Sequence, residues 1–240
     1  MRNLAALALF LAAAPLHADT LTEVKSALAK LEGKQPLRAT YEIKHSNSAT
    51  GRFFNQDFAE TAAIEVRIDH EGLNLTYPRA LIDKAENDRD DVKQGTTHVA
   101  RIAPLDVAEM LDFAPTLLDL IGKGTLVEEK QATFSGQPAR LLVLKITEPP
   151  RPGAKDMKVK MTKNQLSLWV GADRVPLAAE HVYSFSAGIL FFHGDGTTKN
   201  AWTFARHEDH LVAVRRQSDS SGSGLGQNSK GTSLEIVTLK

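Results

Sequence analysis

The sequence contains no cysteine, carries no net charge and has few aromatic residues. The absence of cysteine excludes disulfide bonds, thiolate zinc sites, iron–sulfur clusters and cysteine nucleophiles. The 29 basic residues balance 29 acidic ones and form no basic block, whereas binding of nucleic acid requires clustered lysine and arginine to neutralise phosphate. We therefore expect no nucleic-acid partner.

Long hydrophobic runs are also lacking, apart from one at the N-terminus. The stretch from Leu4 to Ala14 is uninterrupted and apolar and follows a positive charge at Arg2. The four residues after it end in a small residue, Ala18. This pattern predicts a secretory signal peptide over residues 1–18, too short to span a bilayer. A buried amphipathic helix fits less well, because the stretch is apolar all round. We expect an exported protein, periplasmic or secreted, with no transmembrane segment in the mature chain.

The mature chain, residues 19–240, is expected to form one domain that starts with a helix and continues with strands. A capping box at Thr20 and Glu23 begins a helix over 20–33. From Leu37, apolar and polar residues alternate with the period of a strand that has one solvent-exposed face. The pattern predicts early strands at 37–44, 52–60, 64–69 and 73–77, with a polar turn at 46–51.

Helices return over 79–94 and 104–122, where Pro115 predicts a kink or a split into two helices. Together they form a helical insertion over residues 79–122. We expect 217–232 to be a loop, because it is too poor in apolar groups to be buried. The later strands are predicted at 125–134, 139–147, 165–170, 177–185, 188–193, 200–207, 211–216 and 233–239, with a proline-rich loop at 148–153. This order predicts an α+β fold with a large, curved, mostly antiparallel sheet of about eleven strands.

No residue pattern identifies a catalytic or metal site. If residues 188–193 and 200–207 pair across a turn at 194–196, His193 and His207 lie too far apart to share an ion. His207 and His210 flank a two-residue turn, which we interpret as a solvated turn with a metal site as the alternative. The serine-elbow motif is absent, and the glycine-rich run at 222–226 lacks the strand and helix of a phosphate loop. We therefore predict no catalytic residues, no metal and no cofactor.

The apolar residues indicate a different kind of site. A curved sheet with so few aromatics needs something to fill its concave face, either the helices or a hydrophobic ligand. The residues predicted to line that face are Tyr41, Ile64, Val66, Leu75, Leu142, Leu144, Leu168 and Phe185. The alternative is that each of them belongs to a core packed under the helices.

Two segments, "LRATYEIKH" from Leu37 and "LSLWVGADRVPLAAE" from Leu166, make the chain resemble the periplasmic lipoprotein-carrier superfamily of outer-membrane lipoprotein-sorting proteins. The resemblance covers most of the mature chain in element order. It implies an unclosed β-barrel of about eleven strands, plugged by helices, that holds acyl chains. The chain departs from those proteins in lacking their proline-containing segment after the early strands and any obvious arginine tether on a barrel strand.

The leading hypothesis is a periplasmic, non-enzymatic carrier or binder of a hydrophobic ligand, such as a lipid or acyl chain, with a role in lipoprotein or lipid handling. An alternative is an envelope module that senses or binds another envelope protein through an edge strand or loop. A hydrolase or metalloenzyme is the second alternative, and it would require converging polar groups.

Overall fold

The computed structural model describes residues 17–51, 54–87, 102–147, 158–189, 192–224 and 226–240. In this part of the chain, no helix is long and apolar enough to cross a membrane. The predicted loop at 148–153 and the last seven residues of the helix predicted over 79–94 lie outside the described residues.

Ten strands form one sheet in which every neighbouring pair is antiparallel. Their order is β3-β2-β1-β10-β9-β8-β7-β6-β5-β4, so the sheet is not closed and β3 and β4 are its two edges. The strands are β1 (Leu37–Gly51), β2 (Phe54–Asp69), β3 (Gly72–Thr76), β4 (Gly124–Phe134), β5 (Gln137–Ile146), β6 (Lys158–Val170), β7 (Pro176–Ile189), β8 (Phe192–His207), β9 (His210–Gly224) and β10 (Gln227–Leu239). This confirms the prediction of an unclosed, antiparallel α+β fold.

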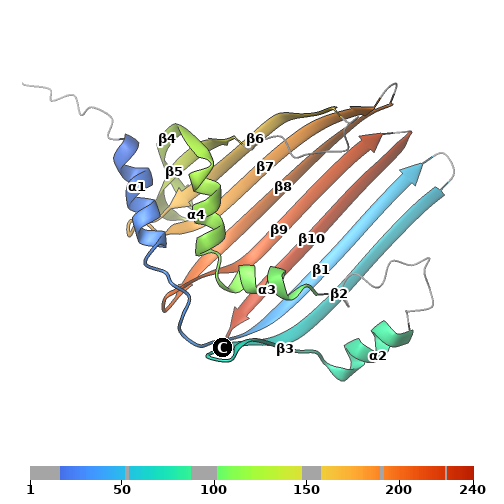
Figure 1. Cartoon of the computed structure of the whole chain (residues 1–240), viewed down its shortest axis with the longest axis horizontal. Helices are drawn as coiled ribbons and strands as arrows, with labels where there is room; N and C mark the ends of the chain where they lie inside the picture. The colour runs from blue at the N-terminus through green and yellow to red at the C-terminus, as the bar shows by residue number, and fades with distance from the viewer. Residues whose placement is uncertain (1–16, 52–53, 88–101, 148–157, 190–191, 225) are drawn as a thin grey trace, which may run out of the picture.

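Four helices accompany the sheet, and three of them lie together at one end of the strands (Figure 1). The helices are α1 (His17–Leu28), α2 (Arg79–Asn87), α3 (Pro104–Leu111) and α4 (Ala114–Gly122). The predicted split near Pro115 is confirmed, because α3 ends at Leu111 and Pro115 lies in the first turn of α4. Helix α2 lies apart from the others, beyond edge strand β3 (Figure 1).

The strands are longer than the sequence predicted, and three expected turns or loops are wrong. Residues 46–51 continue β1, 194–196 lie inside β8, and most of 217–232 belongs to β9 and β10. The physical reason is pairing. These polar and glycine-rich stretches are hydrogen-bonded to strands on either side, and composition does not reveal that the backbone of a polar segment is paired this way.

The strand predictions at 52–60 and 64–69 merge into β2, and 188–193 is divided between the end of β7 and the start of β8. His193 and His207 are still too far apart to share a metal ion. Both now lie on one strand, fourteen positions apart by their numbers, which corresponds to roughly 46 Å.

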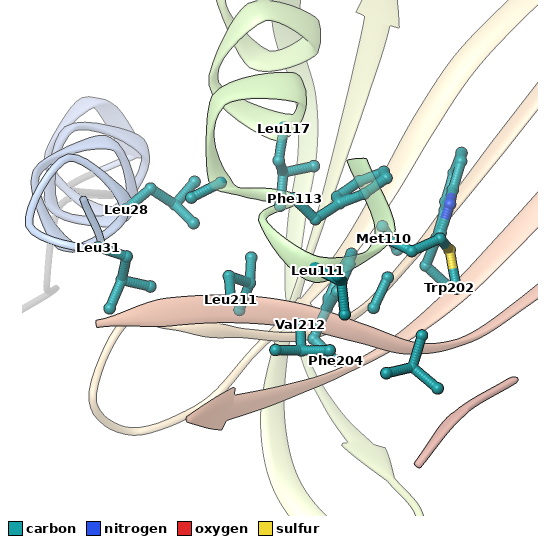
Figure 2. Close-up of a cluster of buried hydrophobic side chains, with 14 of the residues drawn as sticks. Leu28, Leu31, Met110, Leu111, Phe113, Leu117, Trp202, Phe204, Leu211 and Val212 are labelled. Atoms are coloured by element: carbon teal, nitrogen blue, oxygen red, sulfur yellow. The ribbon is translucent and has the colours of Figure 1, made fainter. Parts of the chain in front are cut away.

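The hydrophobic core lies between the helices and the end of the sheet that they cover. Figure 2 shows Leu28 of α1, Met110 and Leu111 of α3, and Leu117 of α4 gathered above β8 and β9. All four side chains are fully buried. Burying a leucine or methionine side chain contributes about 1.5–3 kcal/mol, so this cluster fixes the helices on one half of the sheet.

Candidate functional site

The helix-bearing face of the sheet has two halves of different chemistry. The half under α1, α3 and α4 is apolar and filled. Among the described helices, none extends over the other half, where β1 and β7 to β10 run on beyond them (Figure 1). A cavity of about 750 Å³ lies over that other half, within the roughly 300–1,000 Å³ range of small-molecule sites.

We call this cavity the trough. Its floor is made by β8 and β9, on which small residues pair across the strands. Gly194 pairs with Gly224, Gly196 with Gly222, and Thr198 with Ser220. The side chains at its margins come from neighbouring strands and are Phe185 and Ala187 of β7, Ser229 of β10 and Ala49 of β1. Glycine inside a strand marks a place where another group can approach the backbone closely.

Phe185 owes its position to the glycine beside it. A Cβ built on Gly196 would lie 2.5 Å from Cζ of Phe185, so the ring rests against the bare backbone of β8. Such packing of an aromatic ring on a glycine compensates for the missing side chain in the sheet. The ring remains half-buried and offers an apolar surface at the margin of the trough.

A buried ionic network separates the trough from the core. Arg216 of β9 donates two hydrogen bonds to Glu235 of β10, from Nε to Oε1 at 2.9 Å and from Nη2 to Oε2 at 2.5 Å. Tyr41 donates its hydroxyl to Glu235 at 2.8 Å, and Arg216 also reaches Glu109 of α3 at 3.4 Å. This bidentate geometry is the strong form of a charge-assisted hydrogen bond. No arginine tether is obvious in the sequence, but in the structure Arg216 is a strand arginine that contacts the covering helix α3 through Glu109.

The network shifts the pKa of two of its members. Burial, with the neighbouring Glu235 carboxylate, raises the pKa of the Tyr41 phenol far above its ordinary value. For Arg216, burial lowers the pKa but the charge and hydrogen bonds of Glu235 outweigh it, so the net shift is upward. The phenol is therefore neutral and the guanidinium charged at neutral pH.

The predicted ligand-lining residues fall into three groups. Six of them belong to the buried core cluster: Tyr41, Ile64, Val66, Leu142, Leu144 and Leu168. Leu75 is half-buried and packs against that cluster, and Phe185 alone lies at the trough. Their contact with a ligand stays a prediction.

The turn between His207 and His210 binds the segment that joins α1 to β1, residues 29–36, which we call the α1 connector. His210 is fully buried, and its Nε2 lies 2.7 Å from the carbonyl oxygen of Gln35, to which it donates. Asp209 accepts hydrogen bonds from the backbone N–H groups of Lys34 and Gln35 at 2.9 and 3.2 Å. In the part of the chain that the structure describes, no three His, Asp or Glu side chains gather as metal ligands.

Asp112, at the junction of α3 and α4, lies in the same region as His210. Burial raises the pKa of its carboxyl group, and the nearby His210 only partly opposes this shift. A Cβ on Gly33 would lie 2.5 Å from its Oδ2, and Gly33 has φ +64°. Glycine at position 33 therefore lets the connector pass close to Asp112.

Comparison with known proteins gives structural likenesses only. No family model matches the chain, and no curated protein sequence matches it. An outer membrane lipoprotein-sorting protein domain from Vibrio parahaemolyticus is 13% identical over 93% of both chains, with a TM-score of 0.32. A DUF1329 family protein from Desulfovibrio piger is 7% identical over 90% of both chains, with a TM-score of 0.29. MucB, solved in complex with MucA, is 9% identical over 92% of this chain and 93% of its own, with a TM-score of 0.19. The first of these carries the name of the family that the sequence resembles.

The trough could not be predicted from the sequence, because the part of β9 that forms its floor has the composition of a polar loop. Along β9, Ser218, Ser220, Gly222 and Gly224 recur at every second position, which places them on one face of the strand. The residues between them, Asp219, Ser221 and Ser223, are also small and polar, so composition alone does not distinguish this stretch from a polar loop. Pairing with equally small residues on β8 then turns the stripe into a floor.

Proposed function

We propose that this protein is an exported, non-enzymatic carrier or binder of a hydrophobic ligand such as an acyl chain, which it holds in the trough. The observation that carries the proposal is the trough itself, a preformed cavity on the same face of the sheet as the helices. The predicted signal peptide over residues 1–18 supports export, and with it a role in lipid or lipoprotein handling in the envelope.

The chemistry of the trough fits reversible binding. Its lining offers an aromatic ring at Phe185, methyl groups at Ala49 and Ala187, and bare backbone at the floor. Each CH₂ group that leaves water for such a surface contributes about 0.8 kcal/mol. One acyl chain can therefore bind tightly by burial, and release needs no chemical step.

Edge pairing with another envelope protein is less well supported. Edge strand β4 carries Glu128 and Lys130 and contains a bulge between Leu126 and Glu128, where the exposed Val127 lies. Edge strand β3 is five residues long. Charges, bulges and short length are the usual protections against edge-to-edge pairing.

The test is native mass spectrometry of the protein after export to a bacterial periplasm, with organic extraction and lipid analysis of any bound species. The variant Gly222→Val fills the trough, because a Cβ there meets only the Ser229 hydroxyl, at 3.3 Å, and a backbone oxygen at 3.6 Å. Lys230→Val is the control, since Lys230 is exposed on the opposite face of the neighbouring strand β10 and lies outside the trough.

We expect a bound lipid or acyl species in the wild type and in Lys230→Val, and its loss in Gly222→Val. A wild-type protein that is free of ligand and takes up no added palmitate would contradict the proposal. That result would favour the alternative function, a module that binds another envelope protein.

A further inference from the structure

A continuous row of polar side chains crosses the sheet between the core and the trough. The row is held by cross-strand pairing from β1 to β7. We call it the polar belt, and its members are His45, Ser233, Ser218, Asn200 and His181. A ligand lying along β8 and β9 from the trough toward the helices would therefore pass from an apolar surface onto hydroxyl, amide and imidazole groups.

On this face, the strands that form the belt and the trough supply no lysine or arginine that is left to pair with a ligand, as far as the described residues go. Outward from Trp202, Arg216 is the one lysine or arginine that the described register places on this face of β1 and β7 to β10. Its guanidinium is already engaged by Glu235 and Glu109. The charged side chains at positions 199, 219 and 230 alternate with the trough residues and face the other way. The charged residue that lines the trough, Asp195, is acidic. An ionised head group would lose hydration here and find no partner charge.

An unused hydrogen-bond donor lies at the inner margin of the belt. Trp202 is 7% exposed, and its indole N–H has no hydrogen-bond partner in the described structure. Figure 2 shows its ring at the side of the core cluster remote from Leu28 of α1. The next residue of β8 on the same face, toward the trough, is Asn200 of the belt. An indole N–H can only donate, so any group that binds it must be a hydrogen-bond acceptor.

We propose that the ligand is an amphiphile with one acyl chain and an uncharged, oxygen-bearing head group, such as a glycerol ester. The acyl chain lies in the trough, the head group lies on the polar belt, and an ester or hydroxyl oxygen accepts the Trp202 N–H. This assignment rests on the proposed function and adds the class of head group. It distinguishes neutral glycerides from free fatty acids with the same chain.

The experiment compares two probes with the same chain, monopalmitoylglycerol and palmitate, by isothermal titration calorimetry of the full exported protein at pH 8, below the micellar concentration of each. At that pH palmitate is an anion, while the glyceride is neutral. We expect the glyceride to bind about tenfold more tightly, because the carboxylate must be desolvated without a partner charge. Trp202→Phe keeps a buried aromatic ring and removes the N–H. We expect it to weaken glyceride binding about fivefold and to leave palmitate binding unchanged.

The outcomes separate the two proposals. If neither probe binds, the proposed function fails. If both bind with equal affinity, or palmitate binds more tightly, the trough is a binding site but the assignment of the head group is wrong. If Trp202→Phe weakens the binding of both probes equally, the indole N–H does not distinguish the two head groups. The comparison of the two probes on the wild type needs no substitution, so it stands even if the variant fails to fold.

Discussion

Replacing Arg216 by methionine should destabilise the protein severely, and the reason lies with its partner. Glu235 is only 3% exposed and receives two of its three hydrogen bonds from the guanidinium. Methionine preserves most of the side-chain volume but leaves that carboxylate with the Tyr41 hydroxyl alone. Breaking a buried pair by removing one partner costs about 3–5 kcal/mol.

The size of the effect can be converted to a melting temperature. For a chain of this length, each kcal/mol shifts Tm by roughly 2–4 °C, so Arg216→Met should lower Tm by about 10 °C. The assay is urea unfolding followed by circular dichroism, with thermal unfolding as a second measurement. The double variant Arg216→Met with Glu235→Met removes both charges, and replacing a whole buried pair by apolar groups is often neutral.

We therefore expect the double variant to recover most of the lost stability. A double variant no more stable than Arg216→Met alone would refute the reasoning. The cost would then come from lost packing or from the contact with Glu109, and not from the stranded carboxylate. Arg215→Met is the control, since Arg215 is exposed on the same strand and its loss should change stability by less than about 0.5 kcal/mol.

Three further predictions concern the helices and the α1 connector. Asp112→Asn should stabilise the protein at neutral pH and flatten the pH dependence of its stability in urea unfolding. The reason is that the pKa of Asp112 is raised in the folded protein. The wild type is therefore most stable below the ordinary carboxyl pKa and loses this stability as the pH rises through the folded-state pKa. Phe113→Ala should cost about 3–5 kcal/mol and shift Trp202 fluorescence to the red, because the Phe113 ring lies 5.2 Å from the indole; unchanged emission would show that the indole is shielded by other groups. Asp209→Ala should cost about 1 kcal/mol and speed amide hydrogen exchange at residues 34–35, whose N–H groups it accepts, whereas Asp209→Asn should keep part of that protection.

The sequence was sufficient for the parts of the fold that depend on local patterns. The alternation that begins at Leu37 predicted β1, and the proline at 115 predicted the break between α3 and α4. These features are encoded within a few neighbouring residues, by the period of burial or by the missing backbone donor of proline. The resemblance to lipoprotein carriers added the unclosed topology, which local patterns do not contain.

What the sequence did not predict depends on pairing between distant segments. Residues 217–232 look like a loop because they are rich in serine and glycine, yet most of them pair with β1 and β8 as parts of two long strands. The contact of Arg216 with Glu109 of α3 spans more than a hundred residues, and no local spacing signals it. Both the trough and the network beside it arise from such distant contacts.

The most direct test of ligand binding in the trough uses the absence of cysteine, because one introduced thiol is then unique. A polarity-sensitive dye is attached at Ser229→Cys, at the margin of the trough, or at Lys230→Cys, on the opposite face of the same strand. Each labelled protein is titrated with monopalmitoylglycerol and palmitate. We expect a saturable blue shift of the dye at position 229 and none at position 230. Equal shifts at both positions, or no shift at position 229 with either probe, would contradict ligand binding in the trough.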